Sequence, residues 1–122
     1  MSSEQIKNAK LIENEFQQLR NEQRNLVDNL GTLEMDLKEH KNVIETLKTV
    51  DPDRKCFRLI DGLLCERTVR VVMPQLIENK DLLEKNITKV TEDIIKKGEQ
   101  INKYKQEHNI KFRGERAAGA GE

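Results

Sequence analysis

The sequence has few of the residues that build a thick hydrophobic core. Its 122 residues include three Phe, one Tyr and no Trp, although aromatic side chains normally supply much of the buried area of a core. Apolar residues make up 35% and charged residues 36%, against about 45 to 50% and about 25% in typical soluble domains. The length allows one domain. This composition argues against a walled catalytic cavity and leaves two outcomes, a disordered chain or long thin helices.

A surplus of one charge sign and a long apolar run are also missing. The 22 Lys and Arg balance 22 Asp and Glu, whereas a protein that binds the phosphate backbone of nucleic acids needs a basic surplus. No apolar run approaches the length of a membrane span, and the first residues lack both the basic and the apolar part of a signal peptide. We therefore expect a cytoplasmic or nuclear protein that binds neither nucleic acid nor membrane.

Motifs for catalysis and for cofactors are absent as well. The sequence contains no P-loop, no zinc-ligand cluster and no nucleophile elbow. It has two cysteines, Cys56 and Cys65, which could form a disulfide, a metal pair or two buried thiols. An intracellular context favours free thiols. We predict a protein that is not an enzyme and that uses no cofactor and no metal.

Apolar residues do recur at alternating spacings of three and four, which is the heptad pattern of a coiled coil. The first such seam runs from Ala9 to Leu47 and is apolar except at Gln23 and His40. It predicts a helix over about residues 4–49.

A second seam runs from Met73 to His108, and Lys80 and Lys97 interrupt it before His108 ends it. Because proline is best tolerated in the first turn of a helix, Pro74 places the regular start of this second helix near residue 73, and a short turn capped by Thr68 could precede it. We predict a helix over 73–112.

The two seams fit each other if the helices run antiparallel within one chain. In one register apolar residues then meet apolar residues at most positions of the seam, as in Leu19 with Ile101, Leu33 with Ile87 and Leu47 with Met73. The polar residues also face each other, His40 with Lys80 and Gln23 with Lys97. A shift by one heptad would leave these polar groups opposite apolar ones, at a cost of roughly 1 to 3 kcal/mol each. These four residues are therefore expected to set the register.

Between the helices the hydrophobic period changes to two, and the segment 54–69 predicts a β-hairpin that turns at Asp61-Gly62. Both of its faces carry apolar residues. A lone two-stranded hairpin is marginal in water and has two open edges, so the missing strands must come from other subunits. The residues expected to mediate this assembly are Cys56, Phe57, Leu59, Ile60, Asp61, Gly62, Leu63 and Leu64.

This order of elements resembles the β-class prefoldin subunits, and those of eukaryotes in particular. The resemblance covers roughly residues 10–112 and rests on five stretches of sequence. They are Leu33 to His40, Val43 to Lys48, the Arg-Lys-Cys-Phe-Arg run at 54–58, Glu66 to Val69, and the His-Asn-Ile ending of 105–110.

The resemblance implies a heterohexamer of two α-class and four β-class subunits, in which the hairpins form a double β-barrel and the coiled coils project from it. It also implies ATP-independent capture of unfolded proteins, notably actin and tubulin, and their transfer to the cytosolic chaperonin, with a nuclear pool beside the cytoplasmic one. On this basis we expect a prefoldin domain over 1–114 followed by a disordered tail at 115–122.

The helix ends farthest from the hairpin are the expected contact region for unfolded clients. Apolar residues there have incomplete partners, and exposed apolar groups on several arms can bind weakly at many points. The simpler alternative is that these residues finish the coiled coil. The expected contact residues are Ile6, Ala9, Ile12, Phe16, Ile101, Tyr104, Ile110 and Phe112, with Leu11 beside them. A competing function is a structural coiled-coil adaptor in a cytoskeletal or tethering complex, which would have no use for the hairpin.

Overall fold

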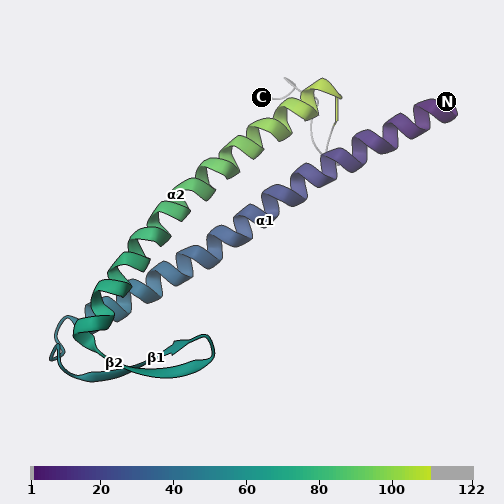
Figure 1. Cartoon of the computed structure of the whole chain (residues 1–122). Coiled ribbons are helices and arrows are strands. Elements are labelled where there is room, and N and C mark those ends of the chain that lie inside the picture. The colour runs from purple at the N-terminus through teal and green to yellow at the C-terminus, as the bar shows by residue number, and fades with distance from the viewer. Residues whose placement is uncertain (1, 111–122) are drawn as a thin grey trace. The chain divides into compact units, whose positions relative to one another are not determined.

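The computed structural model describes residues 2–110. In chain order it contains helix α1 (Ser3–Leu47), strands β1 (Lys55–Ile60) and β2 (Leu63–Thr68), and helix α2 (Val69–Glu107), as Figure 1 shows. The predicted fold class, two long helices connected by one β-hairpin, is confirmed. The expected tail at 115–122 lies outside the described residues, as does Phe112.

A reciprocal pair of hydrogen bonds marks the start of α1. The backbone N–H of Gln5 donates to Ser2 Oγ at 3.2 Å, and the N–H of Ser2 donates to Gln5 Oε1 at 2.8 Å. This capping box satisfies two donors that the first turn of a helix leaves unpaired. At its other end α1 stops at Leu47, two residues before the predicted limit, where the N–H of Val50 closes a turn on the Leu47 carbonyl.

The second helix begins at Val69, directly after β2, and not near residue 73 as the position of Pro74 suggested. The preceding loop makes this possible, because the N–H of Val69 donates to the Arg54 carbonyl at 3.1 Å and the N–H of Arg70 donates to the Pro52 carbonyl at 2.8 Å. Loop carbonyls thus accept hydrogen bonds that a helix start normally lacks. Pro74 consequently lies inside the helix.

The other end of α2 is also set by local geometry. Asn109 has a positive φ of 52°, and the N–H of Ile110 donates to the carbonyl of Lys105 at 2.9 Å while that of Asn109 donates to Gln106 at 3.3 Å. These are the two hydrogen bonds of a Schellman motif. Helix α2 therefore ends at Glu107, before the predicted limit of 112.

The two strands pair antiparallel, from Lys55 opposite Thr68 to Ile60 opposite Leu63. Asp61 and Gly62 at the turn both have positive φ, 49° and 81°, as a type I′ turn requires. The predicted turn and pairing are confirmed. The sheet of the described chain has these two strands only.

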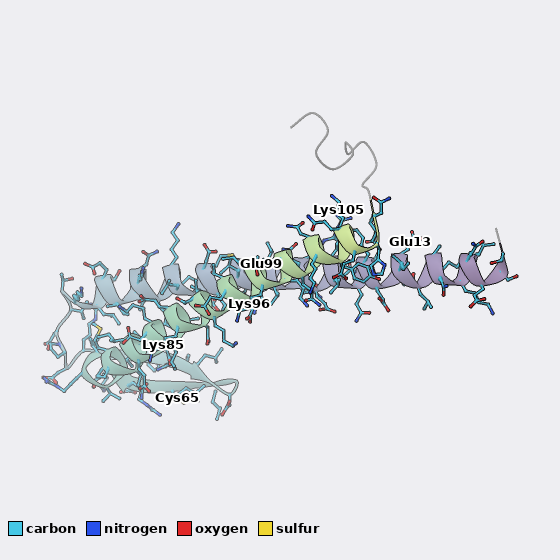
Figure 2. The ribbon with its side chains drawn as sticks, turned by 90° about the horizontal axis from the view of Figure 1, so that it is seen from above. Glu13, Cys65, Lys85, Lys96, Glu99 and Lys105 are labelled. Atoms are coloured by element: carbon cyan, nitrogen blue, oxygen red, sulfur yellow. The ribbon has the colours of Figure 1, made fainter. Side chains whose placement is uncertain are left out.

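The chain divides into two compact units, each of which contains parts of both long helices. The helical unit comprises residues 2–28 and 91–110, and the hairpin unit comprises residues 29–90. In both units the seam positions from Ile12 to Tyr104 are buried or half-buried, while Ala9 and His108 at the two ends of the seam are exposed. Charged side chains such as Glu13, Lys96 and Glu99 stand on the outer surface of the helical unit (Figure 2).

In each unit the helical segments run antiparallel. In the helical unit Tyr104 bonds to Glu15, and Lys97 pairs with Glu22. The residue numbers of the partners thus increase along one helix and decrease along the other. Within residues 2–110, no helix combines the length and the apolar character needed to cross a membrane.

Candidate functional site

The outer face of the hairpin is apolar and open to solvent. Phe57, Leu59 and Leu64 alternate onto this face and remain 63%, 69% and 68% exposed. Side chains of this size are normally buried, and neighbouring exposed ones mark an interaction surface. Ile60 and Leu63 beside the turn are exposed too. The turn residues Asp61 and Gly62 hold these side chains at the end of a regular hairpin.

The inner face of the hairpin rests on α2. Its residues Cys56, Arg58 and Cys65 are half-buried, and Arg58 Nη1 donates a hydrogen bond of 2.6 Å to Gln75 Oε1 on the helix. The alternation of faces predicted from the sequence is therefore present. This face is covered by the chain itself at Cys56, Arg58 and Cys65, whereas Ile60 and Leu63 near the turn stay exposed. The outer face, the turn end and the strand edges are therefore the parts of the hairpin that remain for other chains.

Both cysteines carry free thiols. They lie on neighbouring strands, with Cys56 opposite Arg67 and Cys65 opposite Arg58, so the two are diagonal neighbours. Diagonal Cα atoms lie about 7 to 8 Å apart in such a pair, beyond usual disulfide reach. Residues 2–110 contain no group of three or more His, Cys, Asp or Glu that could hold a metal ion.

The loop before the hairpin is tied to the start of α2 by an ion pair. Arg70 Nη2 lies 3.1 Å from Asp53 Oδ1 and its Nε lies 3.3 Å away. Both side chains are largely exposed, so the pair contributes at most about 1 kcal/mol to stability. Its role is to hold the loop against the helix start, where Val69 and Val72 are 4% and 6% exposed.

In the helical unit, aromatic packing closes the seam near its end. Phe16 and Ile101 are 3% and 8% exposed. The rings of Phe16 and Tyr104 stack with centroids 6.3 Å apart, and the Arg20 guanidinium lies 5.9 Å from the centroid of Phe16. His108 packs on Tyr104 at a centroid distance of 4.2 Å.

The Tyr104 hydroxyl fastens this packing to α1. It donates to Glu15 Oε2 at 2.7 Å and lies 3.3 Å from the Ile12 carbonyl oxygen. Desolvation of the phenol and, second, the Glu15 carboxylate raise the pKa of Tyr104 to about 12, because both disfavour the charged phenolate. The hydroxyl thus stays protonated and remains a donor over a wide pH range.

Beyond this closed packing, apolar residues at the start of α1 are open to solvent. Ile6 is 44% and Leu11 is 58% exposed, and Ala9 is exposed as well. The predicted client-contact residues therefore fall into three groups. Ile6 and Ala9 are exposed, Ile12, Tyr104 and Ile110 are half-buried, and Phe16 and Ile101 are buried. The eighth, Phe112, lies outside the described residues.

The polar seam residues of the helical unit bond to groups other than each other. Gln23 Nε2 donates to the Ile94 carbonyl at 3.4 Å, and Lys97 Nζ lies 2.7 Å from Glu22 Oε2. The hydrogen bond from Lys97, together with its charge, lowers the pKa of Glu22. Lys97 thus lays its stem along the seam and carries its ammonium to a carboxylate at the edge.

In the hairpin unit, too, the polar seam residues bond to groups other than each other. His40 Nδ1 lies 2.8 Å from the Asp36 carbonyl oxygen one turn earlier, and Lys80 Nζ lies 3.5 Å from Glu84 and 3.7 Å from Asp81. Each polar side chain thus finds its partner at the edge of the seam or on its own helix. The role of these residues in setting the register stays a prediction.

Comparison with known proteins assigns the family. A family model described as "Prefoldin subunit" matches residues 10–115. The chain belongs to the prefoldin subunit family. "Probable prefoldin subunit 2" of Drosophila melanogaster is 61% identical over 124 residues, which cover 99% of this chain and 87% of the fly protein. "Prefoldin subunit 2" of Homo sapiens is 46% identical over 100 residues, which cover 82% of this chain and 65% of the human protein.

A solved structure agrees with the fold. The prefoldin beta subunit from Thermococcus strain KS-1 superposes with a TM-score of 0.67 at 13% identity, over 82% of this chain and 88% of that one. At this identity the likeness concerns the fold alone. These sequence relatives, which are named prefoldin subunit 2, bear out the resemblance to eukaryotic prefoldin subunits that the motifs indicated.

Membership of the prefoldin family gives the two open regions a context. Prefoldin subunits are non-enzymatic chaperone components, and they assemble with other prefoldin subunits into hetero-oligomers. This chain is thus a subunit of the prefoldin cochaperone. An exposed apolar hairpin face is what a subunit that completes its sheet with other chains needs.

Sequence reasoning missed two of the most deeply buried residues, Val69 and Val72. They precede the predicted helix start at 73, so they were not counted in the seam. The sequence did contain a signal for this extension of the helix. Three apolar residues follow Val69 at spacings of three, four and seven, as on one face of a helix: Val72, Met73 and Leu76.

Proposed function

We propose that this prefoldin subunit works in a cytoplasmic heterohexamer, with a nuclear pool, that captures unfolded actin and tubulin without ATP and passes them to the cytosolic chaperonin. In this proposal two α-class and four β-class subunits form the hexamer. The start of α1 contacts the client, and the hairpin joins the chain to its neighbours.

The exposed start of α1 is the observation that carries the proposal. The seam is closed as far as Phe16, where Tyr104 bonds to Glu15. Before that point Ile6 and Leu11 are exposed in an intact helix that a capping box begins. An ordered helix with apolar side chains open to solvent can bind an unfolded segment at little entropic cost to itself. Several such helices in one complex would add avidity.

The hairpin supports the assembly part of the proposal. Its outer face offers Phe57, Leu59 and Leu64, and both strands have an edge without a partner among the described residues. A neighbouring strand would satisfy the backbone groups of an edge and bury the outer face at the same time. A coiled-coil adaptor would need neither feature.

The client contact can be tested in a reconstituted hexamer by the double variant Ile6→Ser and Leu11→Ser. We expect weaker suppression of aggregation of unfolded actin, by about two- to tenfold, because this subunit supplies only part of the avidity. The matched control changes Val27 and Ile95 to Ser, which are 49% and 58% exposed in the same unit but do not lie at the start of α1. Equal suppression by both double variants would reject the proposed contact.

The mass of the purified complex separates the proposal from the adaptor alternative. A hetero-oligomer of about six chains is expected. A stable homodimer of this chain would favour the adaptor.

A further inference from the structure

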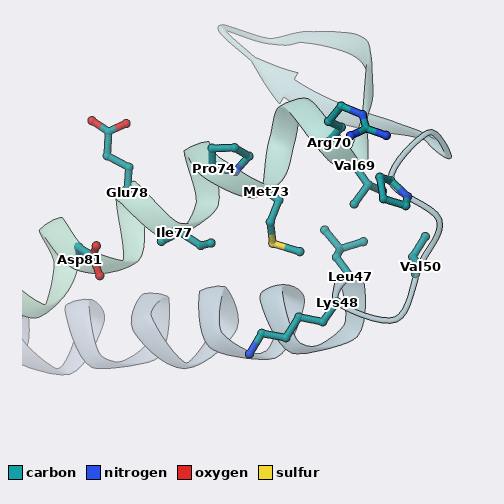
Figure 3. A pocket seen from close by; sticks show the side chains of 11 residues that line it. Leu47, Lys48, Val50, Val69, Arg70, Met73, Pro74, Ile77, Glu78 and Asp81 are labelled. Atoms are coloured by element: carbon teal, nitrogen blue, oxygen red, sulfur yellow. The ribbon is translucent and has the colours of Figure 1, made fainter.

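A groove opens in the hairpin unit where α1 ends and α2 begins. It has a volume of about 740 Å³, and Figure 3 shows Leu47 of α1 and Met73 of α2 pointing toward each other across it. The volume lies within the range of about 300 to 1,000 Å³ that is typical of binding sites. The walls are mainly apolar and are formed by Leu47, Val50, Pro52, Val69, Met73 and Ile77.

Part of this apolar wall is exposed. Ile77 remains 41% exposed, and its neighbour Leu76 is the residue that the seam uses. A large part of the Ile77 side chain therefore remains available to an occupant of the groove. A surface of this kind, apolar and concave, favours an occupant with apolar side chains.

The charged rim of the groove is unbalanced. Lys48 pairs with Glu45 at 3.1 Å, and Arg70 pairs with Asp53 at 3.1 Å. Among residues 2–110, Glu78 on the opposite rim has no ion-pair partner. An occupant with a Lys or Arg next to its apolar residues would therefore complement the rim.

The groove continues into the hairpin. A second groove of about 510 Å³ lies between β1 and α2, lined by Leu59 and Ile60 on one side and Gln75 and Glu78 on the other. Glu78 borders both grooves. The second groove, in which polar side chains outnumber Leu59 and Ile60, therefore adjoins the first at Glu78 on α2.

This continuity identifies the class of occupant. A standard interface buries about 800 Å² on each partner, which is more than the three side chains of the outer hairpin face can supply. A neighbouring chain that pairs with the hairpin edge would lie next to the groove and could extend its contact into it. An unfolded client is not held beside the hairpin by strand pairing, so it has no fixed position next to the groove.

We propose that the groove is a second assembly contact, in which another prefoldin subunit inserts an apolar side chain flanked by Lys or Arg. The inference rests on the proposed function, because it assumes that the hairpin joins this chain to other subunits. It adds a contact on the helices that the hairpin alone does not explain.

The test variant is Ile77→Lys in the reconstituted hexamer, and the matched control is Ile95→Lys, which places the same change at an exposed position of α2 outside the groove. Ile77→Lys removes an apolar contact and would bury an ammonium group, which is costly without a partner charge, so we expect it to weaken retention of this subunit in the complex about 10- to 100-fold. Native mass spectrometry across a dilution series measures the loss, and the control should match the wild type. Circular dichroism of the isolated variants checks that both remain helical. Retention of Ile77→Lys equal to that of the control overturns the proposal.

A photoactivatable residue at position 77 identifies the occupant directly and does not depend on how the lysine variant folds. Cross-links to another prefoldin subunit support the proposal. Cross-links to a second copy of this chain, to actin, or to no chain overturn it.

The variant Phe57→Lys on the outer hairpin face separates this proposal from the proposed function. If Phe57→Lys abolishes assembly and Ile77→Lys leaves it intact, only the groove contact is wrong. If both assemble normally, the hairpin contact fails as well.

Discussion

Phenylalanine has opposite surroundings in the two units of this chain. In the helical unit Phe16 is 3% exposed and stacks on Tyr104, whereas in the hairpin unit Phe57 is 63% exposed on the outer face of the hairpin. The helical unit thus packs Phe16 and Tyr104 against each other, whereas the hairpin unit leaves Phe57 open to solvent. In a chain with so few aromatic residues, an exposed one is better explained by a partner than by the stability of the monomer.

The largest expected effect comes from truncating these two residues. Phe16→Ala should lower the free energy of unfolding by about 3 to 5 kcal/mol, because it removes a buried ring and leaves a cavity. Phe57→Ala should cost less than about 1 kcal/mol in the isolated chain, where only a cross-strand contact is lost. Urea unfolding of the two variants, followed by circular dichroism, measures both values. Equal losses of unfolding free energy in the two variants would contradict the difference in burial between Phe16 and Phe57.

Two glycines inside the helices allow a second comparison of the two units, with a smaller expected change in stability. Gly31 in the hairpin unit has no atom within 4 Å of an added Cβ, whereas a Cβ at Gly98 in the helical unit would lie 3.2 Å from Gln23 Nε2. Ala is favoured over Gly in a helix by about 1 kcal/mol, so Gly31→Ala should stabilise the chain by close to that amount.

Gly98→Ala should stabilise the chain less, because the Gln23 amide must move. Chemical denaturation of both alanine variants gives the two free energies, and adding Gln23→Ala to Gly98→Ala should recover part of the difference. A larger gain from Gly98→Ala than from Gly31→Ala would show that the Gln23 amide does not hinder a side chain at position 98.

The smallest expected effect is the response of the helical unit to alkaline pH. The pKa of Tyr104 is about 12 in the folded chain against an ordinary value of 10.0, so the unfolded chain loses this proton first as the pH rises. The contribution of Tyr104 to stability is therefore complete below pH 10.0 and decreases as the pH approaches 12.

Comparison with Tyr104→Phe isolates this effect from the titration of lysines. The difference in unfolding temperature between wild type and variant should shrink across that interval. A constant difference would mean that the hydroxyl is not held as the distances to Glu15 and Ile12 indicate.

Much of the fold could be predicted from the sequence because its signals are local. The spacing of apolar residues gave the two seams, and the burial of positions from Ile12 to Tyr104 follows it. The Asp61-Gly62 pair predicted the turn, since both residues adopt positive φ there. The boundaries of α2 were predicted less well. Its start at Val69 depends on carbonyls of Pro52 and Arg54, which no helical pattern contains.

The candidate site was only partly predictable for the same reason. The sequence placed a set of apolar residues at the end of the seam, but it did not separate Ile6, which is exposed, from Phe16 and Ile101, which are buried. That separation depends on how Tyr104 packs across to α1.

The sequence by itself thus determined the type and order of the elements, the hairpin turn and the family, because each follows from residue types at short spacings. Only the tertiary structure decided which apolar residues stay open. The outer hairpin face, the groove beside Ile77 and the exposed Ile6 and Leu11 are open because, among residues 2–110, no segment distant in the sequence covers them. The spacing of apolar residues predicts which face of a helix is buried, but the exposure of a single residue depends on its contacts with distant segments.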